Sequence, residues 1–268
     1  MDNKARILVT NTPAIMLEKG AKIFSRASKE GVARKGLFSV ALSGGSTPRG
    51  MHRLLSREPY HSVVPWKGTH IFWVDERCVP RDHHDSNYGS ARKDLLDSVP
   101  IPSEQVHPIP TGVSPEEGAR QYQKEITDFF DTSEVSPPAF DLIFLGIGMD
   151  GHTASLFPGQ TPLTGSKKWV ISVKGGTPFV SRITMTYPLL NLARQVVFTV
   201  SGRGKAGILK TIFEEKNARL PAQAIRPSGG GLLWLLDRDA ASLLPERLIQ
   251  EDTVISPIET NFRNNTQG

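Results

Sequence analysis

Short apolar runs alternate with longer amphipathic segments along the chain. The short runs are apolar at consecutive positions, as expected for parallel strands buried on both faces. We expect strands at residues 7–10, 38–42, 69–74, 142–145, 169–173, 196–200 and 232–236. We expect helices at residues 13–34, 48–57, 88–97, 115–130, 205–215 and 240–248. This alternation predicts a Rossmann-like α/β fold with a doubly wound, mostly parallel sheet flanked by helices.

Proline and glycine cluster at residues 100–115 and 136–138, which we expect to be loops. Neither cluster coincides with a shift in composition, so we expect a single domain over residues 1–268. Apolar residues make up 38% and charged residues 22% of the chain, which is typical of a globular protein.

Cys78 is the only cysteine, so no disulfide can form within the chain and a reducing compartment fits. No apolar run approaches the ~18 residues of a membrane span. The charged residues near the N-terminus are not followed by the apolar stretch of a secretory signal. We therefore expect a cytoplasmic protein that does not act at a membrane.

The formal net charge of the chain is +5. The basic residues are scattered, and no stripe of lysine and arginine is interleaved with aromatic residues. This distribution argues against a nucleic-acid partner and remains compatible with a small anionic ligand.

A polar, glycine-containing segment follows the predicted strand at 38–42 directly. It reads Ser43, Gly44, Gly45, Ser46, Thr47 and Pro48. Paired glycines let the backbone approach an anion closely, Ser46 or Thr47 can cap a helix, and Pro48 suits its first position. The free N–H groups of such a helix start would bind phosphate. The alternative is a tight turn with a good helix cap and no ligand.

A second polar group follows the predicted strand at 69–74. Asp75 and Arg77 could orient substrate hydroxyls and stabilise an oxyanion, with Asn87 a little downstream. A surface ion pair is the alternative. Between them, His83, His84 and Asp85 carry the donor types of a metal site. Adjacent histidines in so polar a loop are usually solvated, so we expect no metal.

A glycine-rich turn follows the predicted strand at 142–145. Its Gly146, Gly148 and Gly151 match the spacing of a dinucleotide-binding loop. That fingerprint also needs an acidic residue after the next strand, where this chain has Lys174. The turn instead presents Asp150 and His152, and histidine suits general acid–base chemistry near neutral pH.

Two cations complete the candidate residues. Arg182 can grip a phosphate with two parallel hydrogen bonds, and Lys205, just after the predicted strand at 196–200, adds a point charge. Either residue could equally belong to a solvated face.

Together these segments resemble the 6-phosphogluconolactonase family, part of a wider group that includes glucosamine-6-phosphate isomerase/deaminases. The resemblance is carried by residues 43–48, 73–77, 85–88, 146–158 and 181–184 and extends over about residues 10–250. The stretch Asp-Gly-His-Thr-Ala-Ser-Leu-Phe-Pro at 150–158 is the most specific part.

The resemblance implies a Rossmann-like fold, no cofactor, and hydrolysis of 6-phospho-D-glucono-1,5-lactone in the pentose phosphate pathway. It implies that His152 is the general base and that Arg77 binds and polarises the lactone. It also implies that the segment 43–47 and Arg182 hold the phosphate. From the chemistry of the reaction we further expect Asp75 or Asp150 to orient water or hydroxyls. The expected partner is the small phosphosugar lactone, bound by a monomer or a small homo-oligomer.

Two other functions stay open at this point. In the deaminase relatives a glutamate supports the ring-opening histidine, and Phe157 occupies that position here. A phenylalanine cannot relay a proton, so the lactonase is favoured. A sugar-phosphate sensor without activity is the second alternative, although His152 and Arg77 are both present.

Overall fold

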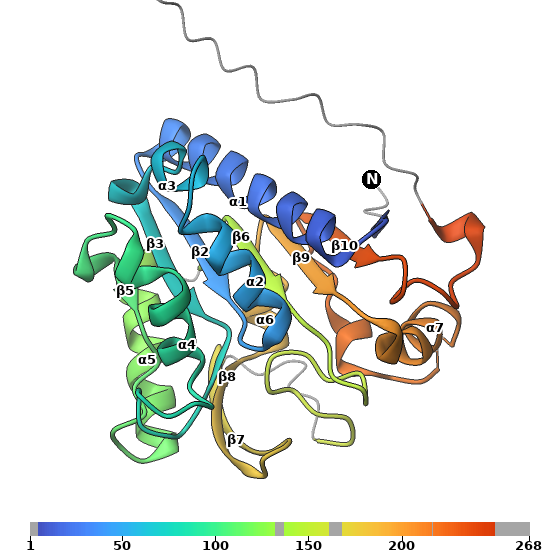
Figure 1. The fold of residues 1–268 in the computed structure, drawn as a ribbon. Helices are drawn as coiled ribbons and strands as arrows, with labels where there is room; N and C mark the ends of the chain where they lie inside the picture. Colours follow the sequence, from blue (N-terminus) through green and yellow to red (C-terminus); the bar gives the residue numbers. More distant parts are fainter. Residues whose placement is uncertain (1–4, 132–136, 161–167, 216, 250–268) are drawn as a thin grey trace, which may run out of the picture.

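The computed structural model describes residues 5–131, 137–160, 168–215 and 217–249. In these residues a seven-stranded sheet has the order β1-β10-β9-β6-β2-β3-β5, and all neighbouring strands are parallel (Figure 1). The strands are β1 (Arg6–Thr10), β2 (Phe38–Leu42), β3 (Thr69–Trp73), β5 (Val106–His107), β6 (Leu142–Leu145), β9 (Gln195–Val200) and β10 (Gly231–Asp237). The predicted α/β fold with a mostly parallel sheet is therefore confirmed.

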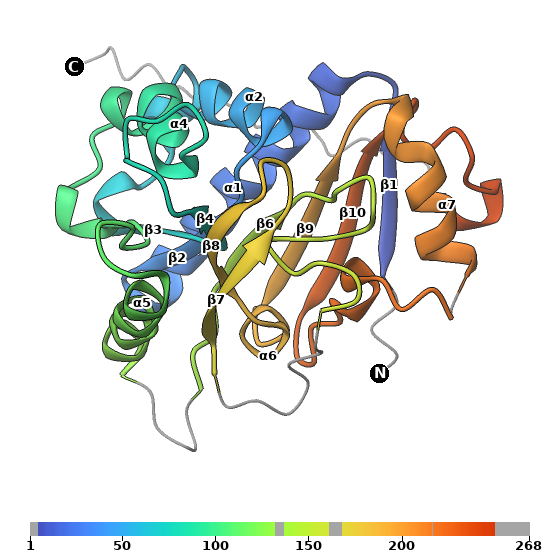
Figure 2. The same ribbon diagram turned by 90° about the horizontal axis from the view of Figure 1, so that it is seen from below.

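Helices flank this sheet, with α1 and α2 on one side and α5 and α6 on the other (Figure 2). The helices are α1 (Pro13–Lys35), α2 (Ser46–Leu55), α3 (Tyr60–Val63), α4 (Asn87–Asp94), α5 (Pro115–Phe130), α6 (Tyr187–Leu190) and α7 (Ala206–Glu214). Short 3₁₀ turns are found at Trp66–Gly68, Leu96–Ser98, Ser103–Gln105, Arg203–Lys205, Pro221–Ala224 and Glu246–Leu248.

Local signals explain where the two longest helices start. The Thr12 hydroxyl accepts a hydrogen bond from the Ile15 N–H and Pro13 occupies the first turn of α1. Ser114 caps α5 in the same way. These are the residue types that the free N–H groups of a helix start require, so both starts match the prediction.

A second, antiparallel sheet was not predicted. It has the order β4-β8-β7, formed by β4 (Asp75–Arg77), β8 (Val180–Met185) and β7 (Val170–Gly175). The prediction of a buried parallel strand at residues 169–173 is therefore wrong. β7 lies at the edge of this sheet and packs against α5, which leaves residues 171–173 half-buried. An apolar run cannot by itself distinguish such an edge strand from a central one.

Two further expectations fail for local reasons. β5 has only two residues, too few for a hydrophobic pattern, and it lies in the segment 100–115 expected to be a loop. The helix expected at 240–248 is absent: residues 238–243 form turns, and only Glu246–Leu248 form a 3₁₀ turn. Pro245 lies inside this segment and has no N–H group to donate to a helical hydrogen bond.

The parallel sheet brings the polar segments together. β2 lies between β6 and β3, and β9 lies beside β6. All these strands run in the same direction, so the segments that follow them emerge at one edge, where open α/β sheets bind their ligands. None of the helices in the described residues is long and apolar enough to cross a membrane.

Candidate active site

A pocket of about 560 Å³ opens at the carboxyl ends of the central strands. Its walls come from the segments after β2, β3, β6 and β9 and from the turn between β7 and β8. The predicted site residues that line it are Ser43, Gly44, Gly45, Asp75, Arg77, Asn87, Asp150, His152, Arg182 and Lys205. Ser46 and Thr47 are not among its lining residues.

The glycine segment after β2 is held against its neighbours. The Ser43 hydroxyl donates to the Phe144 carbonyl over 2.8 Å, which ties the end of β2 to β6. A Cβ on Gly44 would lie 1.7 Å from Asn87 Oδ1, so only glycine allows this loop to approach α4.

The helix after this segment begins earlier than predicted. Gly45, with a φ of 104°, is the N-cap of α2, and no side chain caps the helix. The expectation that Ser46 or Thr47 is the cap is therefore wrong, because both lie in the first helical turn. The N–H groups of that turn have no partner within the helix.

Asp75 is a buried carboxylate whose position is fixed by hydrogen bonds. Its Oδ2 accepts from the Ser155 hydroxyl at 2.6 Å. The Asn87 amide donates to the Asp75 carbonyl at 2.9 Å and reaches Oδ1 at 3.4 Å. These contacts join the end of β3, the start of α4 and the turn after β6 into one wall of the pocket.

Glu76 was missed in the sequence analysis. It is only 2% exposed, and its carboxylate accepts hydrogen bonds from the backbone N–H groups of Arg77, Asn87 and Tyr88 and from the Ser86 hydroxyl. Burial raises the pKa of Glu76 even though the backbone hydrogen bonds act in the opposite direction. Glu76 thus anchors the start of α4 to β4. If β4 had been recognised as a strand, the alternation of side chains would have placed Glu76 on the other face of the sheet from Asp75 and Arg77.

Arg77 and Arg182 face each other across the β4–β8 pair. Arg182 is 4% exposed, and its Nε and Nη2 donate to the Gly175 and Pro178 carbonyls at 2.9 and 3.3 Å. Burial, and then the positive charge of Arg77, lowers the pKa of Arg182.

Arg77 Nη1 donates to the Asp85 carbonyl at 2.6 Å, whereas its buried Nε has no partner among the described residues. Among the described residues, the hydrogen bonds of both arginines go to backbone carbonyls and neither forms an ion pair with a carboxylate, contrary to the surface ion-pair alternative. Two guanidinium groups that form no direct ion pair within the described ranges favour the binding of an anion, although Asp75, Asp85 and Glu76 lie close enough to act on the charge of Arg182.

His152 is positioned by Asp150. The Asp150 Oδ1 lies 2.6 Å from His152 Nδ1 and accepts a hydrogen bond of 3.1 Å from the His152 backbone. Burial opposes ionisation of Asp150, but the hydrogen bonds from His152 and its charge together lower the Asp150 pKa. With Nδ1 directed at the carboxylate, Nε2 is the ring nitrogen left for water or a ligand. Phe157 packs against the ring at a centroid distance of 4.9 Å.

Lys205 approaches the same turn from the 3₁₀ segment after β9. Its ammonium group donates to the Ile147 carbonyl at 2.7 Å. Burial lowers the pKa of Lys205, and the charge of Asp150 opposes this shift. An ammonium group has three donors, so two remain for a ligand. Cys78 does not fit a nucleophile, because burial raises the pKa of its thiol to about 11.

Comparisons with known proteins identify relatives of this chain. The family described as glucosamine-6-phosphate isomerases/6-phosphogluconolactonase matches residues 11–234. A protein of Synechocystis sp. named 6-phosphogluconolactonase is 42% identical over 86% of this chain and 94% of its own length. A protein of Oryza sativa named probable 6-phosphogluconolactonase 3, chloroplastic, is 40% identical over 89% of this chain and 76% of its own length.

A solved structure of 6-phosphogluconolactonase from Trypanosoma cruzi superposes with a TM-score of 0.81 at 31% identity. The superposition covers 91% of this chain and 98% of that one. The chain belongs to the glucosamine-6-phosphate isomerase/6-phosphogluconolactonase family.

Proposed function

We propose that the protein hydrolyses 6-phospho-D-glucono-1,5-lactone to 6-phosphogluconate, a step of the pentose phosphate pathway. The observation that carries this proposal is the His152–Asp150 pair in a pocket that also holds two arginines, neither of which forms a direct ion pair in the described residues. The relatives named 6-phosphogluconolactonase, at 40% and 42% identity, support it.

The substrate phosphate binds, in this proposal, between the segment 43–47 and the cations Arg182 and Lys205. Of this segment, Ser43, Gly44 and the N-cap Gly45 line the pocket, so the backbone just before α2 supplies the N–H donors, and the two side chains supply charge. Arg182 is already oriented by the carbonyls of Gly175 and Pro178, so little side-chain freedom is lost when the anion arrives.

His152 acts as the general base. Its Nε2 takes a proton from water, and the resulting hydroxide attacks C1 of the lactone. Arg77 stabilises the oxyanion that forms on the carbonyl oxygen. When the C1–O bond to the ring oxygen breaks, the proton on Nε2 passes to that oxygen. Asp150 holds the ring and stabilises its protonated form, whereas Asp75 and Asn87 orient the sugar hydroxyls.

A lactone is an activated acyl group, so this chemistry needs neither a covalent nucleophile nor a cofactor. A general base contributes roughly 10²–10⁴-fold and one oxyanion donor roughly 10²–10³-fold. These factors suffice for a substrate that also opens spontaneously.

Phe157 argues against the deaminase alternative. Its ring packs against His152, and Arg182 Cζ lies 5.7 Å from the centroid of the same ring. The residue beside the histidine is therefore apolar, and Asp150 is the carboxylate that pairs with His152 among the described residues. We also propose that the protein is cytoplasmic, forms a single domain, and is a monomer or a small homo-oligomer.

The test is hydrolysis of freshly generated 6-phosphogluconolactone with a metal chelator present and the spontaneous rate subtracted. We expect wild-type protein to accelerate the reaction and His152→Ala to lower kcat by roughly 10²–10⁴-fold, with a small change in KM. The matched control is His61→Ala, which removes an exposed histidine on α3.

Near-normal kcat in His152→Ala would exclude His152 as the base. No acceleration by folded wild-type protein would contradict the proposed reaction itself. Release of ammonia from glucosamine 6-phosphate would then identify the deaminase, and binding of phosphosugars without turnover would identify a sensor.

A further inference from the structure

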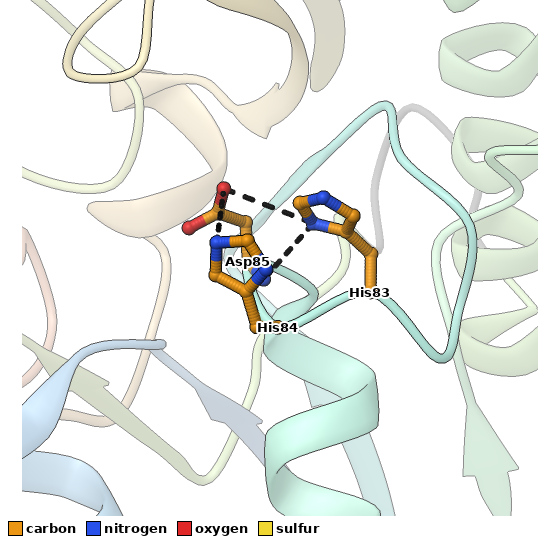
Figure 3. A group of neighbouring side chains, drawn as sticks. All are labelled: His83, His84 and Asp85. Carbon is orange, nitrogen blue, oxygen red and sulfur yellow. Dashed lines mark hydrogen bonds and ion pairs between the residues drawn. The ribbon is translucent and has the colours of Figure 1, made fainter.

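The loop between β4 and α4 carries a cluster of side chains that the proposed reaction does not use. His83 Nδ1 lies 3.7 Å from Asp85 Oδ2, and His84 Nε2 lies 3.4 Å from the same oxygen (Figure 3). All three donor atoms lie within 4.8 Å of one another, and they converge although they come from consecutive residues. None of the three residues lines the pocket.

Contrary to the expectation from the sequence, we propose that His83, His84 and Asp85 form a binding site for a divalent transition-metal ion of the zinc class. A tetrahedral zinc ion with bonds of about 2.0–2.2 Å holds its ligand atoms about 3.4 Å apart. The two distances to the carboxylate are close to this value, so small side-chain rotations are enough to close the site around an ion.

The donor types determine which ions fit. Two imidazole nitrogens and one carboxylate oxygen suit Zn²⁺, Cu²⁺ or Ni²⁺, whereas Mg²⁺ and Ca²⁺ prefer sites made of oxygen alone. The side chains of His83, His84 and Asp85 are 38%, 83% and 25% exposed. An ion would therefore be accessible from solvent and would retain water at its remaining positions.

The loop holds the cluster in shape before an ion arrives. The His83 N–H donates to the Pro80 carbonyl, and the Ser86 N–H donates to the His83 carbonyl, both at 3.0 Å. The Asp85 carbonyl accepts from Arg77 Nη1 at 2.6 Å. Beyond the cluster, Glu76 anchors the start of α4. A backbone fixed at both ends reduces the conformational cost of bringing the donors together.

His83 already has the tautomer that coordination needs. Its Nδ1 accepts a hydrogen bond of 3.1 Å from the Asp85 N–H, so a neutral ring carries its proton on Nε2. An ion would replace this hydrogen bond, which contributes only about 1 kcal/mol net. The lone pair is thus available at little cost.

The experiment is a calorimetric titration of tag-free protein with Zn²⁺ at about pH 7.5, where an ordinary imidazole is neutral. We expect saturable binding of one ion in wild-type protein. His84→Ala and Asp85→Asn should each weaken it by at least about tenfold, the loss seen when even an indirect support of a metal ligand is removed. His84 is so exposed that its replacement will not disturb folding.

His61→Ala is the matched control, because His61 forms another exposed histidine–carboxylate pair, with Glu58 at 3.6 Å, and it should bind Zn²⁺ like wild type. Absence of saturable binding in wild type, or unchanged affinity in His84→Ala, would overturn the proposal. Loss of binding in His152→Ala instead would place the ion at the His152–Asp150 pair and would also overturn it. The measurement does not depend on the proposed lactonase reaction.

Discussion

At the scale of single residues, the position of the His152 ring depends on two neighbours in the same turn, Asp150 and Gly148. Asp150 fixes the ring through Nδ1. Gly148 leaves the space for it, because a Cβ there would lie 2.0 Å from His152 Nδ1. The histidine, its carboxylate and the space they need are therefore all encoded within a few residues.

Asp150→Asn tests the contribution of the carboxylate. The amide is uncharged and no longer stabilises a protonated imidazole, so we expect kcat to fall by roughly 10- to 100-fold with a small change in KM. Steady-state kinetics on the lactone give both constants. A variant with wild-type kcat would show that His152 works without this partner.

The sequence predicted most of these residues because each follows a strand of the parallel sheet. It could not predict the contacts that depend on the second sheet. Arg182 meets Arg77 through the register of β4 and β8, and Glu76 reaches the start of α4 from the opposite side of β4. Such pairings join segments that are far apart in the chain, and the local pattern of residues does not show which segments pair.

At the scale of elements, the strands of the parallel sheet with an apolar run were predicted well, including the edge strand β1, whereas the short strands β4 and β5 were missed. β2 and β6 are buried at every position, so their apolar runs match the predicted bounds. β4 has only three residues, Asp75, Glu76 and Arg77, and all three are charged. Its strand conformation comes from pairing with β8, and hydrophobic periodicity does not report such pairing.

Gly44→Ala tests the contact between the segment after β2 and the start of α4. The added methyl group would overlap the Asn87 amide, so the two elements must separate. We expect a higher KM and a loss of roughly 1–3 kcal/mol in the free energy of unfolding, measured by kinetics and by urea denaturation.

Gly207→Ala is the control for this substitution. Gly207 lies exposed on α7, and a Cβ there would meet nothing within 4 Å. Alanine should leave KM unchanged and stabilise the helix by up to about 1 kcal/mol. If Gly44→Ala gave the same KM and the same stability as this control, the close approach of Gly44 to Asn87 would not be needed for substrate binding or for folding.

At the scale of the whole molecule, two imidazoles, one fully buried and one half-buried, link stability to pH. His52 on α2 is fully buried and neither ring nitrogen has a partner among the described residues, so burial lowers its pKa to about 4. The pKa of His70 on β3 is also lowered to about 4, by burial and then by the neighbouring His107. Both rings are therefore neutral in the folded protein at neutral pH.

We expect His52 to make the fold sensitive to mild acid. The unfolded chain binds a proton on this residue below about pH 6.5, whereas the folded chain does not until about pH 4. The free energy of unfolding should therefore decrease as the pH falls through this interval, by on the order of 3 kcal/mol from His52. His52→Leu should remove that part of the slope in denaturation curves recorded between pH 7 and pH 4.

His61→Leu, at an exposed position, should retain the wild-type slope. An equal slope in His52→Leu and wild type would mean that His52 is not the group responsible.

The pairing of β1 with β10 has a consequence for biosynthesis. β1 pairs only with β10 in the described sheet, through contacts such as Arg6 with Leu233 that span most of the chain. As the polypeptide leaves the ribosome, β1 emerges early and has no strand to join until β10 has been translated. The central strands can assemble during translation, whereas this edge of the sheet closes only near its end.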